Sequence, residues 1–165
     1  MKNITLGLAT IEQKELMANL MEKYEYEFSQ YTGNTMDESG LFGCYEFFET
    51  YLKDEKNFSY IICFDGKLAG FALITERDKA NFSLEEFFIT YNYRNQGVGQ
   101  FAVNYLLEAH KGKWSLVYTP KNLPSKNFWP KVIGEFTGGK FEIYENHPKI
   151  VYDDGTLGTE MRFES

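Results

Sequence analysis

The sequence predicts an α+β domain with a mixed sheet, and three features carry this prediction. Asp65-Gly66 joins two apolar runs, residues 59–64 and 67–75, and such a pair is a strong hairpin signal because both turn positions need positive φ. Residues 84–119 change from a strand pattern to a helix pattern and back, which predicts two parallel strands. A second pair, Asp154-Gly155, predicts a terminal hairpin. Hairpins with only one crossover of this kind argue against a doubly wound fold.

The amino-terminal third combines one strand with two helices. Apolar residues alternate over residues 3–9, which predicts a strand. Thr10 lies three residues before Gln13, as in a capping box, so a helix is expected to follow. The segments expected here are a helix over residues 12–28, a polar surface loop over residues 34–43 and a short helix over residues 44–52.

The remaining segments follow from the same periodicities. Residues 76–80 predict a charged connection, and a strand is expected from about Asn81 through a buried stretch at residues 84–90. A helix is expected after Gly99, and another after Asn122, where Pro130 puts regular helix geometry in doubt. The other predicted strands cover residues 113–119, 140–144, 149–152 and 157–163.

Composition limits the classes of partner. The 165 residues predict one domain, 1–165, that is large enough to bury a core. A formal charge of −7 argues against nucleic acid and anionic membranes as partners. That charge would attract a cationic substrate, although solubility alone explains it equally well.

The two cysteines, Cys44 and Cys63, indicate neither a metal site nor a disulfide framework, and both are expected to be reduced and structural. No secretory signal is evident at the amino terminus, and no apolar run reaches about 18 residues. We therefore expect a soluble, cytoplasmic protein without a metal ion.

The loop Arg94-Asn95-Gln96-Gly97-Val98-Gly99-Gln100 is the strongest candidate for a binding site. Glycine permits a tight turn and a close approach of the backbone to a ligand. The N–H groups of the following helix, together with its dipole, suit a phosphate or pyrophosphate, and Arg94 adds a cation. Alternatively, the glycines serve packing alone.

Two known phosphate-binding patterns can be compared with this loop. Gly97-x-Gly99-x-x-Ala102 satisfies the dinucleotide fingerprint, but residues 117–120 offer no acidic side chain where the ribose would need one. No Walker loop occurs. A Rossmann-like nucleotide binder, which would prefer NAD, is therefore disfavoured.

Arg94-x-x-Gly97-x-Gly99, after a hydrophobic strand and at the start of a helix, resembles the acetyl-CoA loop of the GNAT N-acetyltransferase superfamily. Residues 122–129 look like that family's second cofactor segment, Asn-x-x-Ala-x-x-Phe-Tyr, with Ser125 in the alanine place and Trp129 in the tyrosine place. The run Phe-Trp-Pro-Lys-Val-Ile resembles a subgroup of predicted bacterial acetyltransferases that carry Phe-Trp-x-Lys-Val-Ile. The resemblance spans most of the chain.

The resemblance implies the GNAT fold, a central mixed and mostly antiparallel sheet of about seven strands flanked by helices, and acetyl-CoA as the cofactor. It assigns the cofactor to a strand, the glycine loop and the second segment, namely to Phe88, Ile89, Arg94, Asn95, Gln96, Gly97, Val98, Gly99, Gln100, Asn122, Ser125, Phe128 and Trp129. Asn122 also fits a simple helix N-cap.

Catalysis in this family uses a general base, often a glutamate acting through water. Strand alternation lets only one of Glu85 and Glu86 face the pocket, and we favour Glu85, although it could equally be a solvent-facing edge carboxylate. Trp129 cannot be the usual acid, so Tyr118 is the candidate, or the thiolate leaves without an acid.

The first two helices of GNAT proteins commonly line the acceptor pocket. On that resemblance Tyr24, Tyr26, Glu27 and Tyr31 could bind an ammonium group, or could simply form an acidic helix end. The function expected is acetyl-CoA-dependent transfer of acetyl to a primary amine of a small molecule or peptide, by a monomer or homodimer. The alternative is a noncatalytic acyl-CoA-binding or regulatory domain.

Overall fold

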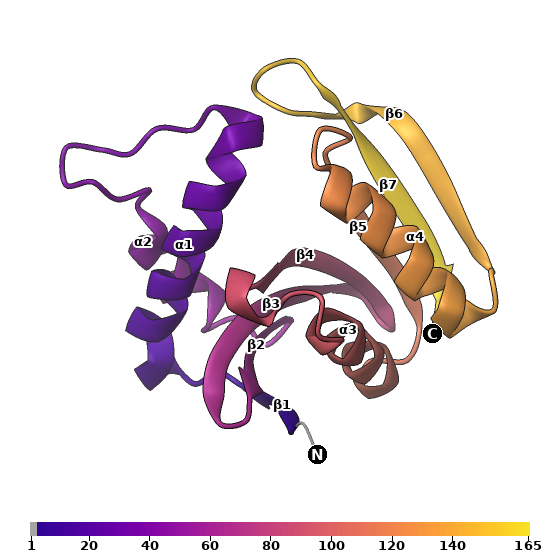
Figure 1. Ribbon diagram of the computed structural model, residues 1–165, viewed down its shortest axis with the longest axis horizontal. Coiled ribbons are helices and arrows are strands. Elements are labelled where there is room, and N and C mark those ends of the chain that lie inside the picture. The colour runs from indigo at the N-terminus through magenta and orange to yellow at the C-terminus, as the bar shows by residue number, and fades with distance from the viewer. Residues whose placement is uncertain (1–2) are drawn as a thin grey trace.

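A single seven-stranded sheet organises the protein in the computed structural model, which describes residues 3–165 (Figure 1). The strand order is β1-β2-β3-β4-β5-β7-β6, and the described strands are all antiparallel to their neighbours except for the β4–β5 pair. The strands are β1 (Ile4–Leu8), β2 (Asn57–Phe64), β3 (Lys67–Asp78), β4 (Asn81–Ile89), β5 (Lys113–Tyr118), β6 (Phe141–Val151) and β7 (Leu157–Glu164). The predicted mixed, mostly antiparallel sheet is confirmed.

Helices cover both faces of this sheet (Figure 1). They are α1 (Lys14–Thr32), α2 (Cys44–Tyr51), α3 (Val98–Ala109) and α4 (Leu123–Thr137), with short 3₁₀ segments η1 (Ile11–Gln13) and η2 (Tyr91–Tyr93). The helices α1 and α2 pack on one face, and α3 and α4 pack on the other. Gly33 ends α1 in the left-handed conformation, as a glycine stop predicts.

Alternation along β3 divides the core between the two faces. Phe71 and Leu73 pack with α1 and α2, whereas Ala72 and Ile74 pack with α3 and α4. All four are fully buried. The sheet is therefore a two-sided core, and the backbone of its central strands is held rigidly.

Both predicted hairpins are present. Asp65 and Gly66 have φ of 48° and 74°, and Gly155 has φ of 82°. At the first helix the backbone N–H of Thr10 donates to Gln13 Oε1 at 3.1 Å, as the capping-box spacing predicted.

Three segments differ from expectation. β3 extends to Asp78 and leaves only a tight turn where a charged connection was expected, because cross-strand pairing with β4 continues through residue 81. β6 is one strand rather than two pieces, with an irregularity around Asn146, whose φ is 53°. α4 runs through Pro130, since Trp129, Val132 and Ile133 are buried against the sheet and hold the helix together.

Within residues 3–165, no helix has the length and apolarity needed to cross a membrane.

Candidate functional site

The two central strands pair along only part of their length. Residues 81–84 of β4 pair in parallel with residues 113–116 of β5, and in the described chain no strand pairs with residues 85–89 on that side. We call residues 81–84 the closed half of β4 and residues 85–89 the open half. An open half leaves backbone groups available to a ligand.

Antiparallel alternation decides which of these groups face outward. The N–H of Thr90 donates to Ala69 O at 2.8 Å, so residue 90 points toward β3 and residue 88 must do the same. The backbone of Phe88 is consequently committed to β3, where its carbonyl oxygen lies against Gly70. Phe87 and Ile89 direct their N–H groups to the open side. Of the two expected backbone contacts, Ile89 has the required direction and Phe88 does not.

A β-bulge separates the two halves of β4. Leu84 pairs with Ile74, but Glu86 pairs with Leu73, so Glu85 is an extra residue. The extra residue reverses the alternation, and Glu86 and Phe88 therefore point to the face covered by α1. The bulge thereby brings Glu86 to the α1 face, and the choice between Glu85 and Glu86 as the base stays a prediction.

Glu85 and Glu86 have different partners as a result. Glu85 forms an ion pair with Arg77 near the surface. Glu86 lies beside Tyr24 of α1, which hydrogen-bonds its carboxyl group. Burial raises the pKa of Glu86 from 4.5 to about 7; the hydrogen bond from Tyr24 opposes the shift, and Glu25 and Glu85 add to it. A carboxyl group with such a pKa can accept a proton near neutral pH.

The glycine loop opens α3 as the sequence predicted. Asn95 and Gly97 have φ of 57° and 83°, and Gly97 is the residue before the helix. The first helical hydrogen bond runs from the N–H of Phe101 to Gly97 O at 3.0 Å. The N–H groups of Val98, Gly99 and Gln100 precede it and have no acceptor within the helix, which is the arrangement that favours an anion.

Gly99 is needed for close packing in this loop. A Cβ built on it would lie 3.2 Å from the ring of Phe128 and 3.7 Å from Ile89. The side chains of Gln96 and Gln100 are turned to the protein, toward Asn92 O and Glu135 respectively.

Arg94 does not point outward from the loop. Its Nε donates to Ile89 O at 2.7 Å, and its Nη2 donates to Glu27 Oε2 of α1 at 2.7 Å. The guanidinium carbon is also 5.7 Å from the Phe88 ring centroid. The cation expected to pair with phosphate is therefore already paired, on the α1 side of the sheet.

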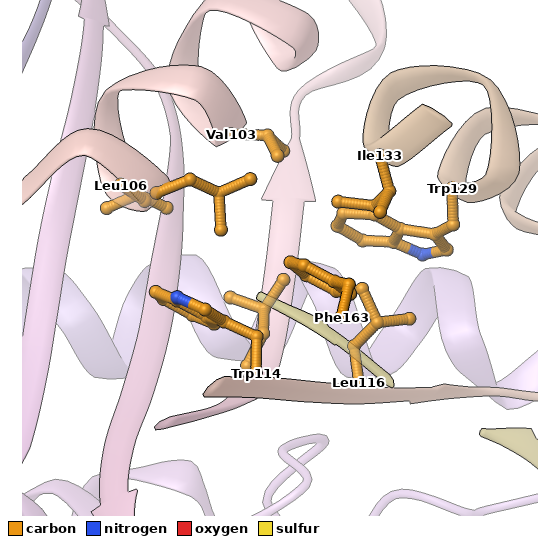
Figure 2. A pocket seen from close by; sticks show the side chains of 9 residues that line it. Val103, Leu106, Trp114, Leu116, Trp129, Ile133 and Phe163 are labelled. Carbon is orange, nitrogen blue, oxygen red and sulfur yellow. The ribbon is translucent and has the colours of Figure 1, made fainter. Parts of the chain in front are cut away.

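The second cofactor segment lies at the start of α4. Asn122 Oδ1 accepts a hydrogen bond from the N–H of Ser125 at 3.1 Å, so this side chain caps the helix. Phe128 stacks on Phe87 with centroids 6.1 Å apart. Trp129 is only 6% exposed and turns into the core between α4 and the sheet (Figure 2).

Trp129 helps to line a small void at the closed half. Figure 2 shows it facing Leu116 and Phe163, with Val103 and Leu106 opposite. The void measures about 10 Å³, which is at the lower limit for one water molecule, and its lining is apolar. The indole is therefore a packing residue in this structure.

Tyr118, the candidate acid, ends β5 beyond the last pair with β4. It is buried, and burial raises the pKa of its hydroxyl, with a smaller contribution from Glu145. A raised pKa keeps this phenol protonated and able to donate.

The expected acceptor residues divide into three groups. Tyr24 is packed edge-on against Phe71 and Phe88, beside Glu86. Tyr26 is 68% exposed and lies on the opposite side of α1. Glu27 forms an ion pair with Arg94. Tyr31 packs on Phe28.

Two further residues near Glu86, Tyr152 and Glu25, were not among the candidates that the sequence analysis named. Burial and the charge of Glu86 raise the pKa of Tyr152, in the β6–β7 turn, to about 12. Burial also raises the pKa of Glu25, on α1. No local pattern marks Tyr152, because only the completed sheet brings the terminal hairpin to β4.

Comparison with known proteins identifies the family of this chain. The family model described as "Acetyltransferase (GNAT) family" matches residues 14–134. No curated protein sequence matches the chain.

Several solved structures share the fold at low sequence identity. An acetyltransferase from Thermus thermophilus superposes with a TM-score of 0.71 at 13% identity, over 99% of this chain and 97% of that one. A spermidine N-acetyltransferase from Vibrio cholerae, in complex with CoA and spermine, gives 0.68 at 15% identity over 98% and 95%. The microcin C7 self-immunity acetyltransferase MccE, in complex with acetyl-CoA and AMP, gives 0.67 at 15% identity over 96% and 90%.

The family match covers well over half of the chain. In this structure β4 and β5 are paired over only part of their length, and the glycine loop precedes α3. The chain belongs to the acetyltransferase (GNAT) family.

Proposed function

We propose that this protein is an acetyl-CoA-dependent N-acetyltransferase that acts on a primary amine by direct transfer. One observation carries the proposal: outward backbone N–H groups on the open half of β4 lie next to a partly buried carboxyl group, Glu86, whose pKa is about 7. A site for a thioester and a base for an amine thus occur on one short segment. Family membership supports the reaction class.

The residues present fit the cofactor. Its pyrophosphate would be held by the N–H groups of Val98, Gly99 and Gln100 at the start of α3. Its pantetheine arm would follow the open half of β4, held by Phe87 and Ile89 in place of Phe88. When bound, acetyl-CoA supplies a thioester carbonyl for attack and a thiolate leaving group.

Glu86 takes the proton from the attacking amine in this proposal and replaces Glu85. Its pKa of about 7 is suited to this role, because the carboxylate is present at neutral pH and retains affinity for a proton. Tyr24 holds the carboxyl group by a hydrogen bond. Glu85 is left with Arg77.

Two groups complete the mechanism. The N–H of Ile89 or Phe87 stabilises the negative charge that develops on the carbonyl oxygen, and it is preorganised because β3 fixes the strand. Tyr118 would donate a proton to the departing thiolate, since a phenol is protonated at neutral pH.

The acceptor is expected to be cationic. Glu25 and Glu86 lie near one another, and Arg94 and Arg77 are already paired with Glu27 and Glu85 respectively. One structural neighbour was solved with spermine. We therefore choose a matched probe set that differs in the group remote from the amine: putrescine, butylamine and γ-aminobutyrate.

Two measurements test the function. Calorimetry should detect acetyl-CoA binding and no NAD binding. Thiol release from acetyl-CoA should be fastest with putrescine and slowest with γ-aminobutyrate. Failure to bind acetyl-CoA would reject the cofactor site, whereas the reverse order of amines would reject only a cationic acceptor.

A noncatalytic acyl-CoA-binding domain remains the second candidate, because Trp129 is buried where the family's acid is expected. The two candidates differ in turnover. Acetyl-CoA binding without thiol release, across a wider amine panel, would favour the noncatalytic domain.

A further inference from the structure

Arg94 and Glu27 connect two parts of the proposed site that are far apart in sequence. Glu27 lies on α1, one turn after Tyr24, while Arg94 begins the glycine loop 67 residues later. The 2.7 Å contact between Arg94 Nη2 and Glu27 Oε2 joins α1, which we call the acceptor helix, to residues 94–100, which we call the cofactor loop.

The guanidinium is held at three sides. Nε is fixed by Ile89 O, Nη2 by Glu27, and the planar group lies over Phe88, with the ring centroid of Tyr91 in η2 5.8 Å away. A fork of this kind uses the planar donors that only arginine offers. It ties the end of β4, the loop and α1 together.

A second arginine–carboxylate pair shows that this arrangement is distinctive. Arg77 and Glu85 join neighbouring strands, and their side chains are 56% and 29% exposed. The Arg94 and Glu27 side chains are 32% and 38% exposed and bridge separate elements. The first pair reinforces a hairpin, whereas the second positions a loop.

We propose that Glu27 is a positioning residue for the cofactor loop, acting through Arg94, and that it thereby couples cofactor binding to the acceptor helix. The inference rests on the proposed function, since it assigns the loop to acetyl-CoA. It replaces two expectations, that Glu27 binds the acceptor and that Arg94 binds phosphate.

The direction in which Glu27→Gln changes CoA affinity separates this proposal from a direct Arg94–phosphate contact. If Arg94 met the pyrophosphate directly, removing the charge of Glu27 would release the guanidinium and tighten CoA binding. If Glu27 orients Arg94 and the loop, the same change loosens the N–H groups of residues 95–100 and weakens CoA binding.

The experiment is a double-mutant cycle on the whole chain, with CoA as the calorimetric probe. Glu27→Gln should weaken CoA binding about fivefold, the lower end of usual coupling between sites. Arg94→Lys keeps the charge but loses the fork, and should weaken binding similarly. The double variant should be no weaker than either single variant, because both remove one linkage.

Glu85→Gln is the matched control, since it breaks an arginine–carboxylate pair away from the loop and should leave CoA affinity unchanged. Amide hydrogen exchange gives a second readout. Glu27→Gln should speed exchange at residues 95–100 when measured well below the unfolding temperature of the variant.

The outcomes are distinct. If the wild-type protein fails to bind CoA, the proposed function falls. Wild-type binding with unchanged or tighter binding by Glu27→Gln rejects the positioning role alone. Should Glu27→Gln fail to fold, Arg94→Lys decides: unchanged CoA affinity in that variant overturns the inference.

Discussion

Residues 81–84 and 85–89 are consecutive halves of β4, but only the closed half is paired on both sides. The closed half contributes Phe82 and Leu84 to the core with α3 and α4. The open half places Glu86 and Phe88 on the α1 face and directs Phe87 and Ile89 N–H groups outward. One strand can thus serve as rigid wall and as binding edge, and the bulge at Glu85 marks the change.

The largest effect should come from Glu86, the carboxyl group of the open half whose pKa is raised to about 7. Glu86→Gln preserves shape and the contact with Tyr24 but removes the base, so kcat/KM for an amine found in the screen should fall about 10²-fold to 10⁴-fold. Acetyl-CoA affinity should be retained, because the loop is untouched.

Glu85→Gln is the control for this change, with the same chemistry one residue away. It should reduce kcat/KM far less than Glu86→Gln. If the two variants lose activity equally, or Glu85→Gln loses more, the bulge does not decide which carboxylate acts.

The next largest effect is a loss of stability at the contact between Gly70 of β3 and Phe88 of the open half. A Cβ on Gly70 would lie 1.9 Å from Phe88 O, and that backbone oxygen cannot move without displacing the strand. Gly70→Ala should lower the free energy of unfolding by about 4 kcal/mol, as measured by urea denaturation.

Gly7 provides the comparison, since it also lies in a strand but a Cβ there meets nothing within 4 Å. Gly7→Ala should be neutral or slightly stabilising. A Gly70→Ala protein as stable as wild type would show that the open half is free to shift away from β3.

The features around β4 also show how much of the fold and the site the sequence could predict. The hairpin at Asp65-Gly66, the parallel crossover and the glycine loop are local signals, and each is where it was expected. The bulge at Glu85 has no comparable signal. It places Glu86 and Phe88 on the α1 face, which simple alternation from Leu84 would not predict.

The same limit applies to long-range partners. The motif located Arg94 but not its destination, because the contact with Glu27 depends on how α1 crosses the sheet. Tyr152 reaches Glu86 only through the β6–β7 hairpin. Helical spacing alone, by contrast, could have excluded Tyr26, which is two residues from the partly buried Tyr24 and so faces solvent.

A third change should affect the closed half alone. Leu84 is buried against α3 and borders the small void with Leu116 and Trp129. Leu84→Ala should cost about 3 kcal/mol of unfolding free energy, from lost burial and an enlarged cavity. Calorimetry well below the unfolding temperature should still give wild-type CoA affinity; a large loss of affinity would mean that the halves are not separable.

The smallest effect is the pH dependence that Glu86 imposes on stability. Because its folded pKa of about 7 exceeds the ordinary 4.5, the folded protein keeps a proton that the unfolded chain releases. Stability from this group is therefore full at low pH and falls as pH rises toward and through 7. Removing the charge with Glu86→Gln should raise the unfolding free energy by about 2.5 kcal/mol more at about pH 8 than at about pH 5. Urea denaturation of both proteins at the two pH values gives this difference, and pH effects shared by other groups cancel in it. A constant difference would mean that Glu86 is ionised throughout and that burial on the α1 face does not hold its proton. In that case the rise of kcat/KM through pH 7, expected from the same group, should also be absent.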